Sequence, residues 1–203
     1  MLAYDISRSL IDKIEPSIEL SEYGIEIAKA HIYNNNFELA DKWILFAKNY
    51  QSEDENYLEK IQSTKLLLNL KKSTNENQFI KILLESEGDL LLEISEDTVK
   101  QEIFLTILSI INDDKDKFLG ENKKLLDERA MPSRYLLNKI KKSFESSNYG
   151  ELLLSISISM INKTWTDIHP EHLRIILIAL QDVEIEHIFK NIVFEILEIS
   201  EII

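Results

Sequence analysis

Apolar side chains recur along most of this chain at spacings of three and four residues, which place them on one face of an α-helix. The clearest stripe lies within residues 97–111 and consists of Val99, Ile103, Ile107, Ile110 and Ile111. Residues 184–200 repeat the pattern, with charged side chains on the opposite face. The pattern therefore predicts amphipathic helices that each bury one side.

Short polar breaks divide the chain into about ten such segments. The predicted helices cover residues 6–14, 17–33, 37–50, 52–69, a short stretch around 79–83, and then 97–111, 134–144, 151–162, 170–181 and 184–200. The helix at 170–181 is apolar nearly all round, so we expect it to lie centrally. The chain ends on Ile202 and Ile203, which we expect to be exposed.

The segment 151–162 has a second interpretation as a strand, because Ser155, Ser157 and Ser159 alternate with isoleucines. Its neighbours are helical and no partner strand is visible in the sequence, so we predict a buried helix. Serines four residues apart would then let another helix approach closely.

Only 4 glycines and 3 prolines occur among the 203 residues. A sheet of this size needs many turns with special backbone geometry, which those residues supply. We therefore predict an all-α fold, an α-α superhelix or stack of helical hairpins without a sheet. Residues 1–203 are expected to form a single helical domain, with a possible subdivision into 1–112, a charged linker or frayed helix at 113–132, and C-terminal hairpins at 133–203.

The formal net charge is −13, and an acidic surface repels phosphate backbones and anionic lipid. We therefore expect neither nucleic acid nor a membrane as partner. The charge is uneven, because residues 101–150 carry +1 while every other quarter is negative. This basic band is either an ordinary solvated set of helix faces or a docking surface for an acidic partner. The candidate binding residues within it are Lys139, Lys141 and Lys142.

The chain contains no cysteine, which excludes disulfides, thiolate zinc sites and cysteine nucleophiles. The N-terminal residues include early acidic side chains and no uninterrupted apolar core, so they do not form a signal peptide. No stretch reaches the roughly 18 apolar residues of a membrane span. A cytoplasmic location is expected if the chain is the complete gene product.

Residues 25–48 carry small side chains where two paired helices would touch. With Ser21 as the first repeat position, Ile27 and Ala28 form a large–small pair, followed by an aromatic residue and two alanines at Phe37, Ala40 and Ala47. This segment, within residues 21–54, resembles one tetratricopeptide (TPR) repeat, the helix–turn–helix unit of TPR solenoids. It departs from the repeat at Gly24, His31 and Ser52. Residues 148–200 are similar to the tail of some uncharacterised bacterial helical proteins.

Three histidines in the C-terminal part, His169, His172 and His187, are candidate metal ligands. Only one Glu-x-x-His pair, Glu184 with His187, is present, whereas a carboxylate-bridged di-iron bundle needs two. A zinc site needs three or four convergent ligands. We therefore predict helix-capping or surface histidines, with neither a metal nor a cofactor.

Other candidate binding side chains are His31 and Tyr33 in the TPR-like hairpin, and Trp165 in the turn at 162–169. His31 could contact a ligand or lie at the edge of the core. Trp165 could pin its loop or serve as an exposed anchor. Trp43 is most simply a core residue. The chain lacks a G-x-S-x-G elbow, a P-loop and a G-x-G-x-x-G motif, so nothing in it points to catalysis.

These patterns favour a protein–protein interaction or adaptor module of helical-repeat type. The alternative is a structural domain of a larger protein that oligomerises through its C-terminal helices. A metal-dependent helical-bundle enzyme built on the histidines is a third hypothesis.

Overall fold

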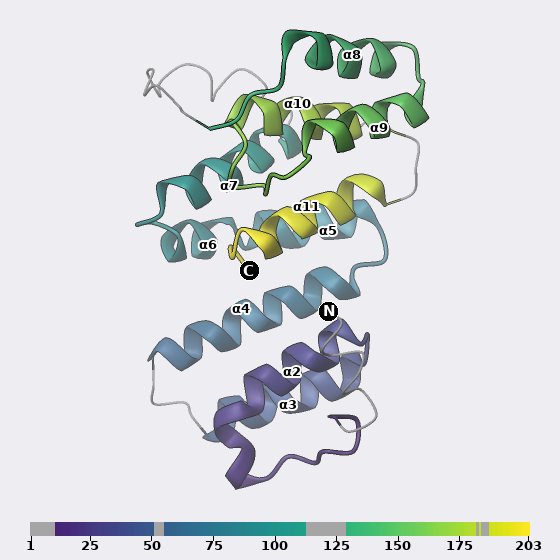
Figure 1. The fold of residues 1–203 in the computed structure, drawn as a ribbon. Coiled ribbons are helices and arrows are strands. Elements are labelled where there is room, and N and C mark those ends of the chain that lie inside the picture. The colour runs from purple at the N-terminus through teal and green to yellow at the C-terminus, as the bar shows by residue number, and fades with distance from the viewer. Residues whose placement is uncertain (1–10, 51–54, 113–128, 182, 184–186) are drawn as a thin grey trace. The chain divides into compact units, whose positions relative to one another are not determined.

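The computed structural model describes residues 11–50, 55–112, 129–181, 183 and 187–203 (Figure 1). Within these residues the fold is all-α, with ten α-helices and no strand. The expectations for residues 6–10 and 113–128 lie outside the described residues. The predicted superhelical arrangement of the hairpins stays a prediction.

Two compact units make up the chain, Met1–Thr74 and Asn75–Ile202. The second unit includes the helix predicted at 97–111 together with all the later hairpins. The single-domain interpretation and the subdivision around residues 113–132 both stay predictions.

The N-terminal unit contains a 3-10 helix, η1 (Ile18–Tyr23), and three α-helices, α2 (Gly24–Tyr33), α3 (Phe37–Tyr50) and α4 (Glu55–Lys72). The predicted helix at 17–33 is therefore divided at Gly24, and the predicted helix at 52–69 ends about three residues later than expected. The helices α2, α3 and α4 pack against one another. Their core is formed by Ile25, Ala28, Ile32, Ala40, Trp43, Ile44, Ala47, Tyr57 and Ile61.

The C-terminal unit begins with α5 (Glu76–Glu85), α6 (Glu87–Glu93) and α7 (Thr98–Ile111). It continues with α8 (Arg134–Glu145), α9 (Tyr149–Ser159), α10 (Pro170–Gln181) and α11 (Ile188–Ile199). The helix α10 contacts α7, α8 and α11, which confirms its predicted central position. The end of the chain differs from the prediction, because Ile202 is buried.

Polar residues set the beginnings of several helices by accepting hydrogen bonds from the first free backbone N–H groups. Asp97 Oδ1 accepts from the N–H groups of Val99 and Lys100, both at 3.0 Å. Asn75 and Asn148 do the same for α5 and α9. These side chains explain why the helices begin close to the positions that the sequence predicts.

Candidate functional site

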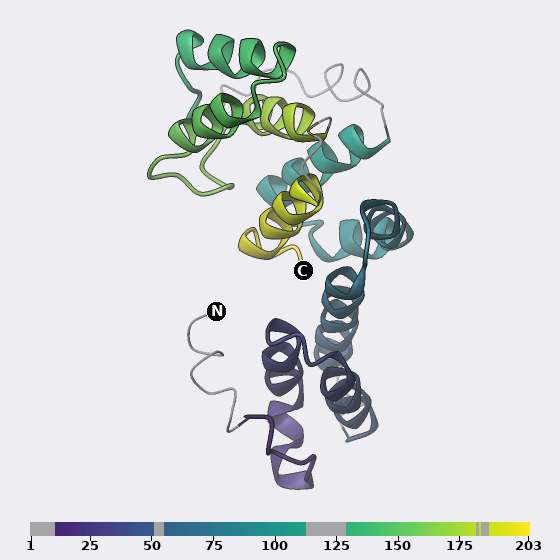
Figure 2. The same cartoon turned by 90° about the vertical axis from the view of Figure 1, so that its right-hand side faces the viewer.

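The helices α8 and α9 form an antiparallel hairpin in the C-terminal unit (Figures 1 and 2). Ser133 Oγ accepts from the N–H of Leu136 at 3.4 Å, and Asn148 Oδ1 accepts from the N–H of Glu151 at 3.3 Å. The turn between the helices passes through Ser147 with a positive φ of 53°. Caps and turn together fix the hairpin geometry.

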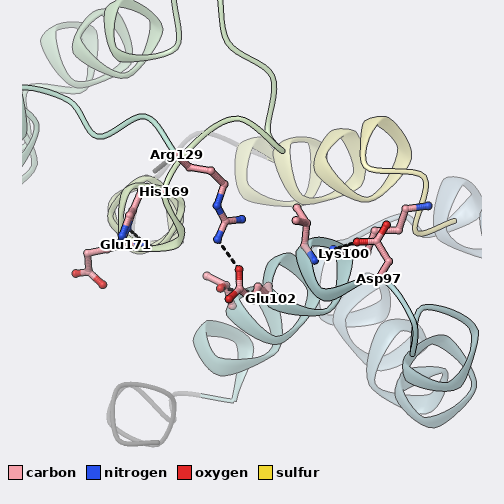
Figure 3. Close-up of polar contacts among 8 residues, drawn as sticks. Asp97, Lys100, Glu102, Arg129, His169 and Glu171 are labelled. Carbon is pink, nitrogen blue, oxygen red and sulfur yellow. Dashed lines mark hydrogen bonds and ion pairs between the residues drawn. The ribbon is translucent and has the colours of Figure 1, made fainter. Parts of the chain in front are cut away.

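The two ends of this hairpin are joined by backbone hydrogen bonds. The N–H of Ala130 donates to the carbonyl of Asp167 at 3.0 Å, and the N–H of His169 donates to the carbonyl of Ala130 at 3.1 Å. Next to this bridge, the Arg129 guanidinium pairs with the Glu102 carboxylate on α7 (Figure 3). These contacts hold together the two chain segments that flank the α8–α9 hairpin and attach them to α7.

The outer face of α9 is apolar and exposed. Leu154 is 59% exposed, Ile158 is 46% exposed, and Ile161, just beyond the helix, is 60% exposed. On the inner face of the same helix, Ser155 and Ser159 are buried at 1% exposure. The predicted helix is confirmed, but the prediction that it is buried is wrong for its outer face.

The buried position of Ser159 has a local explanation. Its hydroxyl donates to the carbonyl of Ile156 at 2.7 Å and lies 2.9 Å from Nε2 of the buried His172 on α10. A serine whose hydrogen bonds are satisfied can be buried at little cost. Its small size also lets the helices approach closely, as the sequence predicted. Leu152 and Ile156 are buried on the same inner face, whereas Leu154 and Ile158 are left on the outside.

The three candidate lysines of α8 differ in their surroundings. Lys139 Nζ lies 3.1 Å from Glu151 Oε1 on α9, and Lys141 Nζ lies 3.8 Å from Glu145 Oε1 one turn further along α8. Lys142 is exposed and makes no ion pair with any described residue. Lys139 and Lys142 share a face because they are three residues apart, whereas Lys141 points to another side.

The ion pair between Lys139 and Glu151 brings one face of each helix into a common surface. Tyr135, Lys139 and Lys142 follow one another on α8 at spacings of four and three. On α9, Glu151, Leu154 and Ile158 do so at spacings of three and four. Tyr135 is 76% exposed. We call these six residues, together with Ile161, the hairpin face.

Charge on the hairpin face is fixed by this ion pair. Hydrogen bonding to Glu151 raises the pKa of Lys139, and the same contact lowers the pKa of Glu151. Both groups therefore stay charged over a wide pH range. Because the Glu151 carboxylate is already occupied, the ammonium group of Lys142 is the charge on this face that is available to a ligand.

The other predicted binding residues do not form a shared surface. His31 is completely buried, with Nδ1 3.6 Å from the Asp12 carboxylate, and Tyr33 at the end of α2 is half-buried. Burial lowers the pKa of His31, which favours the neutral ring. His31 is therefore a core histidine, the second of the two predicted possibilities. Trp43 is also fully buried, as predicted.

Trp165 is not an exposed anchor. It is only 7% exposed, and its Nε1 donates to Glu195 Oε1 on α11 at 3.1 Å. This hydrogen bond attaches the loop between α9 and α10 to the last helix, in agreement with the alternative prediction that the tryptophan pins its loop.

The histidines of the C-terminal unit have separate surroundings. His169 Nδ1 accepts a hydrogen bond from the N–H of Glu171 at 3.1 Å, so it caps α10 as predicted (Figure 3). His172 is buried, in contrast to the predicted capping or surface position. Among the described residues, no group of three or more potential ligands lies close enough together to hold a metal ion.

Ser159 and His172 have the residue types of a nucleophile and its base, but their surroundings do not suit that chemistry. The Ser159 proton is directed to the Ile156 carbonyl and both side chains are buried. In the part of the chain that the structure describes, Nδ1 of His172 has no hydrogen-bond partner that would orient the ring. A nucleophilic pair needs substrate access and an oriented base. This contact is better described as a packing contact between α9 and α10.

Comparison of the chain with protein-family models, with curated proteins and with solved structures gives no match. The resemblance to a TPR repeat therefore stays a prediction. Function is therefore inferred from the geometry of the hairpin face.

Sequence reasoning missed the apolar part of this face. The signal was present, since Leu154, Ile158 and Ile161 are spaced by four and three residues while the buried serines occupy the other side. The alternation of serine and isoleucine drew attention to strand periodicity instead. Which helical face would be buried depended on the neighbouring helices.

Proposed function

We propose that the protein is a protein–protein interaction module built from helical hairpins, and that it binds a partner protein through the hairpin face. The observation that carries this proposal is the exposed aliphatic group on the outer face of α9, Leu154 and Ile158, while the inner face of the helix is already packed. Full burial of a leucine or isoleucine contributes about 1.5–3 kcal/mol, so a grouped set left in water forgoes substantial stabilisation. Clustered exposed apolar side chains of this kind mark interaction sites.

Two further features support an interaction module. The predicted basic band contributes Lys139 and Lys142 to the same surface, so the face combines apolar contacts with charge. The α2–α3 hairpin resembles a TPR repeat, and stacks of such hairpins present extended surfaces to other proteins. Among the described residues, no helix has the length and apolar character needed to cross a lipid bilayer.

Site-specific photocrosslinking in the cells of origin tests the proposal. A photoreactive amino acid at position 158 should yield a covalent adduct with a second protein. The control places the same amino acid at Leu92 on α6, which is 75% exposed but lies outside the hairpin face. If position 158 gives no adduct beyond those formed at position 92, the proposed interaction through this face is wrong.

Substitutions separate the surface from nonspecific capture. Leu154→Asp with Ile158→Asp should abolish the adduct formed from a photoreactive group at position 161, while Leu92→Asp should leave it unchanged. Combined charge reversal of Lys139, Lys141 and Lys142 should weaken capture of the same protein. If the charge-reversed variant captures the protein as well as the wild-type chain does, the lysines do not belong to the binding surface.

Self-association through the C-terminal helices is the second candidate function. It is favoured by Ile199 on α11, an apolar side chain of the C-terminal unit that is 50% exposed. Crosslinking would then give an adduct of twice the monomer mass. A monomer mass that does not change with concentration in light scattering would contradict this alternative.

A further inference from the structure

The apolar residues of the hairpin face form a straight stripe. Leu154 and Ile158 lie about 6 Å apart along α9 at 1.5 Å per residue, and Ile161 follows just beyond the end of the helix. Stripes of this kind pack well against the aliphatic ridge of another helix. The exposed backbone here is already hydrogen-bonded within α-helices, so there is no strand edge to which an extended peptide could add.

The charge around the stripe is opposite to that of the whole chain. Within residues 133–163 the basic side chains are Arg134, Lys139, Lys141, Lys142 and Lys163, and the acidic ones are Glu145 and Glu151. The segment therefore carries +3, whereas the chain carries −13.

Both acidic side chains of this segment already lie in ion pairs with Lys141 and Lys139. Lys142 has no such partner among the described residues, and its three-residue spacing from Lys139 places it on the side of α8 where Lys139 pairs with Glu151 of α9. A ligand that reaches the stripe therefore meets unneutralised positive charge at its border. Charge complementarity calls for a negatively charged ligand.

We infer that the hairpin face binds an acidic amphipathic helix of a partner protein. Its aliphatic side chains, spaced i, i+3 or i+4, and i+7, contact Leu154, Ile158 and Ile161, and aspartate or glutamate residues on its flank approach Lys142. This inference rests on the proposed function and specifies the chemistry of the partner. Tyr135 provides an additional aromatic contact at the border of the stripe.

Selection from a displayed library of random peptides tests this inference without knowledge of the partner. The peptides are about 16 residues long, enough for roughly four helical turns. The full chain serves as the bait, and binders that also bind the Leu154→Asp, Ile158→Asp variant are removed. The exposed positions of both substitutions favour correct folding, which circular dichroism and thermal unfolding verify.

The expected result is enrichment of peptides with aliphatic residues at helical spacing and with acidic flanks. A synthetic peptide of the enriched sequence should bind the wild-type chain in fluorescence anisotropy, and the double aspartate variant should weaken binding by at least about thirtyfold. Lys142→Glu should weaken it by up to about fivefold. Lys141→Glu is the matched control, and it should have less effect because Lys141 lies on another side of α8.

Enrichment of peptides without acidic flanks, or no enrichment at all, would overturn the inference. Binding to vesicles of phosphatidylserine and phosphatidylcholine that the double aspartate variant loses, without peptide enrichment, would also overturn it in favour of a membrane surface. Self-association that is lost in the same variant would identify a second copy as the occupant and overturn it too.

The two proposals fail in different ways. If photocrosslinking at position 158 yields a partner protein but the selection enriches no acidic helix, the proposed function stands and the further inference is wrong. If acidic helices are enriched but no crosslinked partner forms in cells, the surface chemistry is supported and the proposed function is contradicted.

Discussion

Gly24 at the start of α2 lies against Ala47 of α3. A Cβ atom at Gly24 would lie 3.1 Å from Cβ of Ala47, which is closer than most such contacts in proteins. Ala28, Ala40 and Ala47 are completely buried in the same unit. The small residues that suggested paired helices in the sequence therefore lie at a real helix–helix contact.

Replacement of Gly24 by leucine should destabilise the protein by about 1–3 kcal/mol, because the larger side chain forces α2 and α3 apart. The free energy of unfolding measured in urea provides the test.

Gly88→Leu is the matched control, since a Cβ at Gly88 meets nothing within 4 Å. Because this substitution removes a glycine from a helix, the free energy of unfolding should stay unchanged or rise by up to about 1 kcal/mol. Equal losses in the two variants would contradict the close approach at Gly24.

His172 is the most strongly perturbed titratable group among the described residues. Burial lowers its pKa to about 4, and the nearby Lys163 and His169 contribute in the same direction. Because Ser159 directs its proton to Ile156, its oxygen accepts from Nε2–H of His172, which assigns the neutral tautomer. The folded state therefore holds this histidine uncharged.

Acid should destabilise the protein through His172. In the unfolded chain the ring takes up a proton near its ordinary pKa of 6.5, whereas in the folded chain it does so only near 4. Its contribution to stability is thus complete above pH 6.5 and is lost as the pH falls to 4, by about 1–3 kcal/mol. Urea unfolding midpoints across this range provide the measurement.

His172→Gln should remove that part of the acid sensitivity, even if it lowers stability at neutral pH. The control His187→Asn suits the left-handed backbone at this position, where φ is 64°, and keeps His172. If the two variants lose acid sensitivity to the same extent, a group other than His172 is responsible for it.

At the scale of elements, the caps explain why helices begin at defined residues. Asp97 accepts two backbone hydrogen bonds at the start of α7, as Figure 3 shows. Without this carboxylate the first N–H groups of α7 have no partner within the helix. The helix α7 packs on the central α10, so its first turn supports the C-terminal unit.

Replacement of Asp97 by alanine should lower the free energy of unfolding by about 1 kcal/mol, as for other N-cap substitutions. Asp97→Asn keeps an acceptor oxygen and should lose much less. Chemical denaturation of the two variants at neutral pH distinguishes loss of the cap from loss of charge. Equal destabilisation by alanine and asparagine would assign the effect to charge.

At the scale of the whole molecule, the acidic charge and the hairpin face have opposite effects on association. Like charges keep copies of the chain apart at neutral pH, when the net charge is −13. This repulsion disappears near the isoelectric point of 4.8. The exposed stripe of α9 then favours association.

Light scattering should therefore increase steeply as the pH falls from 6 to about 5, and added salt should shift the onset through screening of the charges. Leu154→Asp with Ile158→Asp should reduce the scattering, whereas Leu92→Asp should reduce it less. Equal reduction would show that added charge, and not the position of the stripe, controls association.

Several features of the fold followed from the chain alone. Helical periodicity, together with the scarcity of glycine and proline, predicted an all-α fold, and the ends of α3 and α10 agree with the predicted ranges. These features depend on the spacing of residues along one helix, so local sequence is sufficient to determine them. The cap at Asp97 and the turn after α8 are equally local.

The candidate site was only partly predictable. The sequence indicated the lysines of α8, but it could not tell that Lys139 pairs with Glu151 or that Lys142 has no ion-pair partner among the described residues. It also placed His31 and Trp165 among possible binding residues, although both are buried. Exposure depends on which other helices cover a side chain, and periodicity within one helix contains no such information.

The sequence by itself determined the all-α fold, the order of most helices and the small residues between α2 and α3, whereas α6 was not predicted. Only the tertiary structure decided which side of α9 is exposed. Both sides of that helix carry large aliphatic residues, so periodicity alone did not choose between them. The side that includes Leu152, Ile156 and Ser159 packs inward, with Ser159 against His172 on α10, and Leu154 and Ile158 were thereby left on the surface.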